Sequence, residues 1–216
     1  MKIAVMGTGV VGNTIASKLT ELGHQVMMGS RTKDNEKAKS WAAENGKNAS
    51  AGDYSDAAGF GEIVFNCTKG EASMEALKQA GEKNLESKII IDLSNPLDSS
   101  KGMPPTLSIS NTNSLGEEIQ KAFPGSHVVK TLNTLWCGLM VNPRMLKDSH
   151  NIFMSGNNAE AKSKVKSLLK QFGWQDEEIL DLGDISTARG TESYLPLWLR
   201  VYMSTNNGAF NIKIVR

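Results

Sequence analysis

The chain opens with Met1-Lys2-Ile3-Ala4-Val5-Met6-Gly7-Thr8-Gly9-Val10-Val11-Gly12, an apolar stretch that runs directly into a Gly-x-Gly-x-x-Gly motif. The motif can be a plain strand-to-helix turn, but at this place it is typical of a dinucleotide-binding unit. We expect Gly7 to permit the tight turn, Gly9 to let the backbone approach a diphosphate, and Gly12 to let the helix pack closely. N–H groups at the start of that helix favour an anion. The stretch therefore predicts a dinucleotide site.

The segment 24–32, His-Gln-Val-Met-Met-Gly-Ser-Arg-Thr, is expected to form the second strand of the same unit. NAD sites usually place an acidic residue at the end of this strand, but no acid occurs here before Asp34. Ser30 can donate a hydrogen bond and Arg31 can pair with a 2′-phosphate, with Lys33 or Lys37 as helpers. The alternative is a solvated basic turn. The pattern favours NADP(H) as the cofactor.

Length and charge limit the classes of protein and partner. A chain of 216 residues suits one core, and we expect one domain, with a dinucleotide-binding core over 1–135 and an extension over 136–216 packed on it. The formal net charge of +1 argues against nucleic acid or an anionic membrane as the main partner. A small molecule is the expected partner.

The sequence indicates neither targeting nor metal binding. A core strand begins within two residues of the start, and no apolar run is long enough to span a bilayer, so we expect a cytoplasmic protein without membrane association. Cys67 and Cys137 lack metal-ligand spacing and are expected to be free thiols. No metal site is predicted.

Hydrophobic periodicity predicts an α/β fold of the Rossmann type, with a doubly wound and mostly parallel sheet. The continuously apolar segment 88–93 suits the middle of such a sheet. Strands are expected at 2–6, 24–32, 49–51, 62–67, 88–93, 128–132 and 152–155, and helices at 13–22, 34–45, 55–58, 73–80, 114–123, 158–172 and 186–206. Pro196 should start or kink a turn in the last of these helices.

Three predicted strand ends should meet at the nicotinamide end of the dinucleotide. They are Thr68-Lys69-Gly70, Ser94-Asn95-Pro96 and Asn133-Thr134. In an open parallel sheet, ligands bind beyond the carboxyl ends of the strands. Each sequence is also an ordinary loop, so the prediction depends on the three together.

No general acid or base stands out in the chain, and no catalytic residue is predicted. The histidines 24, 127 and 150 lie next to turns or strand starts, where a satisfied surface histidine is the more common case. Hydride transfer to a flat conjugated acceptor needs alignment above all, with the cofactor supplying the chemistry. The absence of an acid–base pair is compatible with that reaction.

The whole chain resembles the NADPH:deazaflavin oxidoreductases, which are coenzyme F-420-dependent, and the cytoplasmic NADPH domain of the STEAP-type metalloreductases. The resemblance is carried by the glycine motif, Gly29-Ser30-Arg31, Val128-Val129-Lys130, Asn133-Thr134 and, most specifically, 181–189 (Asp-Leu-Gly-Asp-Ile-Ser-Thr-Ala-Arg) with Glu192. It implies a short Rossmann-type enzyme completed by a C-terminal helix and a final strand at 211–215. It also implies hydride transfer between NADP(H) and a flavin or deazaflavin, with ferric chelates as acceptors from the reduced flavin, in a homodimer.

Matching positions of the family imply roles for particular residues. Thr8, Gly9, Val10 and Val11 would bind the diphosphate, Ser30 and Arg31 the 2′-phosphate, and the surroundings of Lys69, Asn95 and Cys137 would line the nicotinamide side. The segment 133–137 departs from the deazaflavin enzymes, which have His in place of Asn133 and Pro in place of Trp136. This departure leaves the acceptor open. Trp136 either stacks on an isoalloxazine ring or fills the core, and the other pocket candidates are Thr134 and Met140.

The C-terminal region is rich in large apolar residues, namely Leu195, Leu197, Trp198, Leu199, Val201 and Tyr202. One helix stripe should not bury all of them in so small a core, which predicts a symmetric dimer. Two other functions stay open: an NADP(H)-binding redox sensor without turnover, and a reductase of a small imine or carbonyl.

Overall fold

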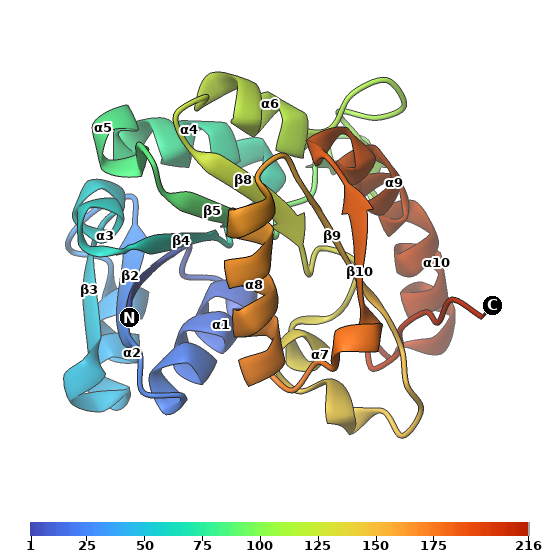
Figure 1. The fold of residues 1–216 in the computed structure, drawn as a ribbon, viewed down its shortest axis with the longest axis horizontal. Helices are drawn as coiled ribbons and strands as arrows, with labels where there is room; N and C mark the ends of the chain where they lie inside the picture. Colours follow the sequence, from blue (N-terminus) through green and yellow to red (C-terminus); the bar gives the residue numbers. More distant parts are fainter. Residues whose placement is uncertain (216) are drawn as a thin grey trace.

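The computed structural model describes residues 1–215, and its centre is one eight-stranded sheet in the order β10-β9-β8-β5-β4-β1-β2-β3 (Figure 1). The strands are β1 (Lys2–Met6), β2 (Gln25–Ser30), β3 (Ala49–Asp53), β4 (Ile63–Asn66), β5 (Ile89–Asp92), β8 (His127–Thr131), β9 (Ile152–Gly156) and β10 (Ile179–Gly183). All neighbours pair in parallel except β8 and β9, so β9 and β10 run opposite to the other six strands. The predicted Rossmann-type, mostly parallel sheet is confirmed.

Helices cover both faces of the sheet, each with its own hydrophobic core (Figure 1). One face packs against α1 (Val10–Glu21), α2 (Glu36–Glu44), α7 (Cys137–Val141) and α8 (Ala159–Gln171). The other packs against α3 (Tyr54–Phe60), α4 (Gly70–Ala80), α5 (Glu82–Leu85) and α6 (Leu115–Ala122). The central strands β4 and β5 are buried along their whole length, as their unbroken apolar runs predicted.

The order of the strands places a switch point beside the glycine motif. From β1 the chain moves outward through β2 to β3, and then returns to the other side of β1 with β4. The turn after β1 therefore lies next to the turn after β4, where ligands bind in open α/β sheets. A separate two-stranded hairpin, β6 (Leu97–Asp98) and β7 (Thr106–Leu107), follows β5.

The C-terminal part differs from the sequence-based expectation in three places. β10 was not predicted, although it is the last strand of the sheet. The single helix expected over 186–206 is divided into α9 (Ala188–Ser193) and α10 (Leu195–Thr205), with Pro196 in the first turn of α10 as expected. The predicted final strand at 211–215 is wrong: this segment is held by one backbone bond, from Asn151 to Ile212 O (3.0 Å), and by side-chain bonds, which do not make a ladder.

Candidate functional site

The glycine motif forms a close contact between β1, α1 and the end of β4. Gly7 has a φ of +116°, and a Cβ there would lie 2.7 Å from the carbonyl oxygen of Cys67. A Cβ on Gly12 would lie 2.0 Å from the carbonyl oxygen of Gly7. Gly9 is different, because its φ is −77° and no atom lies within 4 Å of a Cβ built there. The space beside Gly9 is open, as the approach of a ligand requires.

The start of α1 presents backbone donors to this space. Gly9 is the N-cap residue, and no side chain caps the helix. The first N–H groups of a helix have no intrahelical acceptor, and together with the helix dipole they favour an anion. A hollow of about 360 Å³ on this side is lined by Thr8, Gly9, Val10, Asn13, Thr14 and Lys37. The geometry fits a diphosphate with a lysine beside it.

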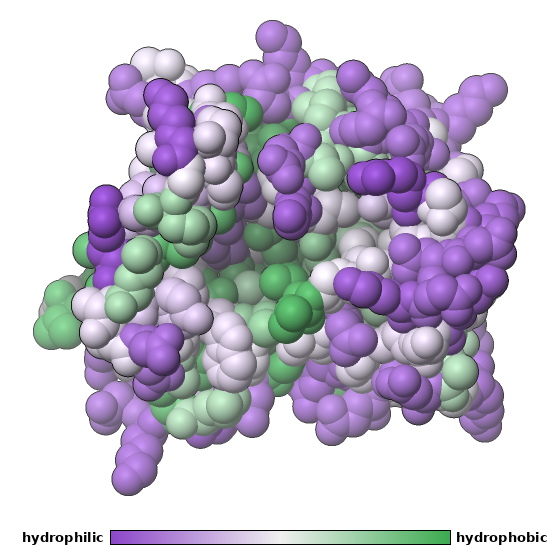
Figure 2. Space-filling model, turned by 180° about the vertical axis from the view of Figure 1, so that it is seen from behind, coloured by the Kyte–Doolittle hydropathy of each residue, from purple (hydrophilic) through white to green (hydrophobic). Residues whose placement is uncertain are grey.

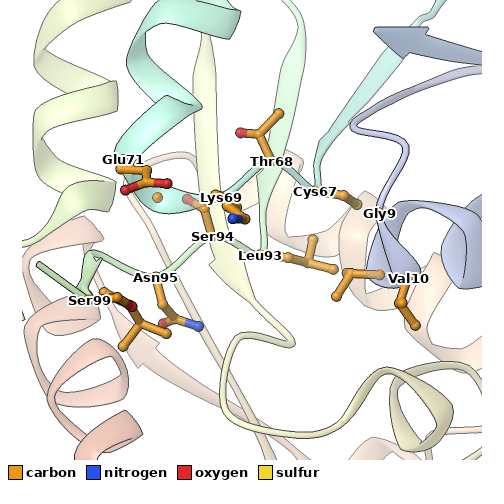
Figure 3. Close-up of a pocket in the computed structure, with 13 residues that line it drawn as sticks. Gly9, Val10, Cys67, Thr68, Lys69, Glu71, Leu93, Ser94, Asn95 and Ser99 are labelled. Carbon is orange, nitrogen blue, oxygen red and sulfur yellow. The ribbon is translucent and has the colours of Figure 1, made fainter. Parts of the chain in front are cut away.

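A larger cavity of about 480 Å³ extends from the start of α1 across the ends of β4 and β5 (Figure 3). Its walls combine backbone donors, hydroxyl and amide groups and a few apolar side chains. They are formed by Gly9, Val10, Val11, Cys67, Thr68, Lys69, Gly70, Glu71, Leu93, Ser94, Asn95, Leu97 and Ser99. The face of the molecule opposite to Figure 1 has a central hollow with hydrophobic residues on its floor, bordered by hydrophilic residues above and on the right of the view (Figure 2). A partly apolar cavity with few polar groups is the usual form of a small-molecule site.

The ends of β5 and β8 are joined by two side chains. The Asn95 amide donates to the carbonyl oxygen of Asn133 (2.9 Å), and the Asn133 amide donates to Asn95 Oδ1 (2.9 Å). Asn95 also lines the large cavity, together with Thr68 and Lys69. Pro96 does not line it, and its carbonyl accepts the N–H of Ser108 (2.8 Å). The structure thus brings the three predicted strand ends together at one edge of the sheet.

Gly70 belongs to one of the three predicted strand ends, but its close packing was not predicted from the sequence. A Cβ on Gly70 would lie 1.9 Å from the carbonyl oxygen of Asn95. The start of α4 and the turn after β5 are therefore in backbone contact. The only signal in the sequence was a glycine directly after a predicted strand end, which many ordinary loops share.

The residues expected at the 2′-phosphate have different surroundings. Ser30 is buried, and its hydroxyl donates to the carbonyl of Thr32 (2.6 Å), so its proton is already engaged. Lys33 pairs with Asp56 (2.9 Å). Arg31 is exposed at the end of β2, and Lys37 lines the hollow at the start of α1. Arg31 and Lys37 are therefore better placed for a phosphate than Ser30 and Lys33.

The residues expected on the acceptor side do not line the large cavity. Met140 is buried in the core, and its carbonyl accepts the indole N–H of Trp174 (2.9 Å), which corrects its assignment to a pocket wall. Cys137 is buried at the start of α7. Thr134 lines another hollow of about 250 Å³, together with Phe153, Leu182, Gly190, Thr191, Tyr194 and Ile212.

Trp136 belongs neither to the core nor to the cavity wall. Trp136 is 39% exposed, and its indole packs against Gly138 and Gly208. A Cβ on Gly138 would lie 2.3 Å from the Trp136 ring, so a glycine is needed there. The exposed part of the ring is accessible for stacking.

A buried ionic cluster lies behind the cavity and was missed by the sequence reasoning. Lys130 on β8 pairs with Asp92 at the end of β5 and with Glu192 on α9 (2.7 Å), and all three side chains are at least 98% buried. Burial alone would lower the pKa of Lys130, but the two carboxylates outweigh it and raise that pKa above its usual value. A lysine and an aspartate inside apolar strand segments were the available signal, because such charges are rarely buried unless paired.

The titratable groups at or near the site do not include an activated nucleophile or a free histidine. Burial, and secondarily Asp92, raise the pKa of the Cys67 thiol far above its usual value, so it stays protonated. His24 is bonded to Gln171 (2.9 Å) and His150 to Asn211 (2.7 Å), both away from the cavity and both buried, not at the surface. Within residues 1–215 no group of three His, Cys, Asp or Glu could hold a metal ion, and no helix is long and apolar enough to cross a membrane.

These features define a dinucleotide-binding protein of the oxidoreductase type, and comparisons with known proteins agree. A family described as "NADP oxidoreductase coenzyme F420-dependent" matches residues 2–96. A solved structure from Arthrobacter sp. FB24, described provisionally as an F420-dependent NADP-reductase, is 46% identical, with a TM-score of 0.93 and full coverage of both chains. The chain belongs to this family of NADP-dependent oxidoreductases.

Two further relatives are more distant. Metalloreductase STEAP3 from Rattus norvegicus is 26% identical over 203 residues, which are 91% of this chain but only 38% of that protein. The chain thus spans well under half of the length of this curated relative. An imine reductase from Myxococcus stipitatus, solved with NADP⁺, is 16% identical with a TM-score of 0.68, over 95% of this chain and 63% of that one. This last likeness concerns the fold alone.

Proposed function

We propose that the protein transfers a hydride between NADP(H) and a flavin or deazaflavin acceptor. The observation that carries the proposal is the continuous cavity from the uncapped start of α1 to the ends of β4 and β5. It lies where the nicotinamide half of a dinucleotide reaches in this fold. The family, described as coenzyme F420-dependent, supports the deazaflavin as the first acceptor to test.

The cofactor's phosphates would be held by the N-terminal half of the chain. Val10 and Val11 are the first residues of α1, which has no side-chain cap, and the free N–H groups and the dipole at a helix start favour a diphosphate. Thr8 and Lys37 line the same hollow. Arg31, exposed at the end of β2, would form a charge-assisted pair with the 2′-phosphate, with Ser30 shaping the turn. An acid at this place would repel that phosphate, so its absence supports NADP(H) over NAD(H).

The nicotinamide end would lie against the wall formed by Thr68, Lys69, Ser94 and Asn95. When bound, the nicotinamide supplies or receives the hydride. The residues of this chain hold the ring in place and limit access of water. The Asn95–Asn133 pair fixes the adjoining turns, and the partly exposed Trp136 follows Asn133 closely in the chain. We assign Trp136 as a stacking surface for the acceptor.

The same proposal includes a homodimer formed by the C-terminal part. Apolar side chains are exposed on α10 and after it: Leu197 (59%), Tyr202, Met203, Ile214 and Val215. Large apolar side chains exposed in number on one part of a protein are typical of a surface that meets a partner. Light scattering is expected to give twice the chain mass, and a monomer at every concentration would refute the dimer.

The proposed activity is tested by following NADPH absorbance with a panel of acceptors: deazaflavin, FMN, FAD and a ferric chelate. We expect oxidation of NADPH with at least one tricyclic ring, and reduction of the chelate only when such a ring is present. If NADPH binds tightly but is not oxidised with any of these acceptors, the proposal is overturned and a redox sensor is favoured. Turnover of a cyclic imine in place of the flavins would point to the third alternative.

A further inference from the structure

The buried cluster behind the cavity has no part in the proposed phosphate contacts, yet it is bonded to the cavity wall. Lys130 Nζ donates to the carbonyl oxygen of Ser94 (2.8 Å), in addition to its two carboxylate partners. Ser94 lines the cavity and is itself 3% exposed (Figure 3). The lysine therefore holds one residue of the wall by its backbone.

Asp92 holds the same residue by two further bonds. Its Oδ1 accepts the N–H (3.1 Å) and the hydroxyl (2.6 Å) of Ser94. The same oxygen accepts the amide of Asn66 at the end of β4 (2.8 Å). Asn66 Oδ1 in turn accepts the hydroxyl of Thr68 (2.6 Å), another residue of the wall. The hydroxyls of Ser94 and Thr68 thus have fixed orientations, both traced back to Asp92.

Glu192 fixes the other side of the lysine. Its two carboxylate oxygens accept the N–H groups of Leu115 (2.7 Å) and Gly116 (3.0 Å) at the start of α6. This carboxylate would keep two donors and a favourable helix dipole even without the lysine. The cluster therefore joins α6 and α9 to the turn after β5 through a single ammonium group.

A buried ionic cluster is not in itself a device for stability, since well-packed apolar residues would often serve as well or better. The bonds to Ser94 suggest a different use. We propose that Lys130 is a positioning residue, which, through Ser94 and Asp92, holds the wall of the large cavity in the arrangement that aligns the nicotinamide ring. The proposal rests on the proposed NADP(H) site, but not on the identity of the acceptor.

The test separates positioning from stability with a charge-balanced variant, Lys130→Met combined with Asp92→Asn. The asparagine keeps an oxygen that can accept from Ser94. The buried Glu192 carboxylate loses its ammonium partner but keeps its two N–H donors at the start of α6. The matched control is Arg144→Met with Glu178→Gln. It removes another ion pair that includes a buried carboxylate. Neither residue of this pair lines the cavity.

Two ligands report on the two halves of the cofactor. The first is 2′-phospho-ADP-ribose, which lacks the nicotinamide, and the second is NADPH, whose nicotinamide emission reports the surroundings of the ring. In the Lys130/Asp92 variant we expect the Kd of NADPH to rise about tenfold and its emission to approach that in water, while the Kd of 2′-phospho-ADP-ribose changes less than about twofold. The control variant should change neither ligand's Kd, whatever happens to its melting temperature.

An equal rise in the Kd of both ligands, or an unchanged NADPH emission in the folded variant, would overturn the proposal. If the double variant does not fold, Lys130→Arg supplies the same readout, because the guanidinium keeps a positive charge between the two carboxylates but its larger, planar group cannot place the same donor on the Ser94 carbonyl oxygen. We expect this variant to alter NADPH emission in its folded fraction, and unchanged emission would again contradict positioning. These tests measure binding, so their outcome does not depend on whether the acceptor assay detects turnover.

Discussion

The glycine turn after β1 and the turn after β5 serve the same cavity but are built on different principles. The first is shaped by backbone contacts: Gly12 can carry no side chain, and the start of α1 has no side-chain cap. The second is shaped by side chains from distant segments, with Lys130, Asp92 and Glu192 all buried behind it. A backbone site is encoded locally in the sequence, whereas a side-chain site depends on which strands become neighbours. The following predictions test this difference, starting with the largest effect.

The largest effect is expected for Gly12→Ala in the backbone-built turn. Its new Cβ would lie 2.0 Å from the carbonyl oxygen of Gly7, and neither backbone can yield without separating α1 from β1. We expect a loss of about 3 kcal/mol or more in the free energy of unfolding, measured by denaturant titration. Gly9→Ala is the control, because its φ of −77° suits alanine and its Cβ meets no atom. This variant should keep its stability and lose affinity for NADPH; equal melting losses in both would contradict the distinction.

The next effect concerns cofactor choice at the same end of the site. Arg31→Ala should lower the affinity for NADPH by about 10- to 150-fold, because a charge-assisted contact contributes about 1.5 to 3 kcal/mol. The affinity for NADH should change little, since it lacks the 2′-phosphate. Isothermal titration with both cofactors measures the difference, and Lys33→Ala is the matched control because Lys33 is held by Asp56. Equal affinities for the two cofactors in the unmodified protein would end the assignment to NADP(H).

A smaller effect is expected for Trp136→Ala on the acceptor side. Truncation of a fully buried tryptophan lowers the free energy of unfolding by about 3 to 5 kcal/mol. Because Trp136 is 39% exposed, we expect a loss of about 1 to 2 kcal/mol. The KM for the acceptor should rise while the Kd of NADPH stays constant, because the two ligands use different parts of the site. A normal KM would show that the ring only packs against Gly138 and Gly208.

The smallest effect is a pH dependence at a pair remote from the cavity. Burial alone would raise the pKa of Glu178, but the Arg144 guanidinium and the N–H of Gln175 outweigh it and lower that pKa below 4.5. A lowered folded-state pKa stabilises the protein above the unfolded value, and this contribution is lost as the pH falls through the folded value. Glu178→Gln should therefore lose less stability than the unmodified protein on acidification below about pH 4.5, the ordinary glutamate value. Parallel melting curves against pH would disprove this role of the carboxylate.

The sequence predicted the local parts of the molecule well. The glycine turn and the apolar strands β4 and β5 follow from short patterns, and each is present. The helices expected over 114–123 and 158–172 are present as α6 and α8. At the start of α6 the Ser114 hydroxyl accepts the N–H of Glu117 (3.1 Å), while the carboxylate of Glu117 binds that hydroxyl and Arg189, a residue far along the chain.

The misses arise where distant segments decide the structure. β10 lies at the sheet edge and is half-exposed, so it lacks the apolar run that identifies a buried strand. The segment 211–215 has the alternation of a strand, but its neighbour Asn151 binds it mainly through side-chain groups. Lys130 and its two carboxylate partners lie on three different elements, and no spacing rule relates them. Of the residues expected around the acceptor, Met140 lies in the core because α7 turns it inward.

A crystal structure with NADP⁺ bound tests the central claim most directly. The account predicts the diphosphate at the start of α1, the 2′-phosphate beside Arg31, and the nicotinamide ring against the wall of Thr68, Ser94 and Asn95. The hydrogen bond from Lys130 to the Ser94 carbonyl and those from Ser94 to the Asp92 carboxylate should be unchanged in the complex. A nicotinamide ring bound elsewhere, for example in the hollow beside Thr134 and Tyr194, would contradict the account.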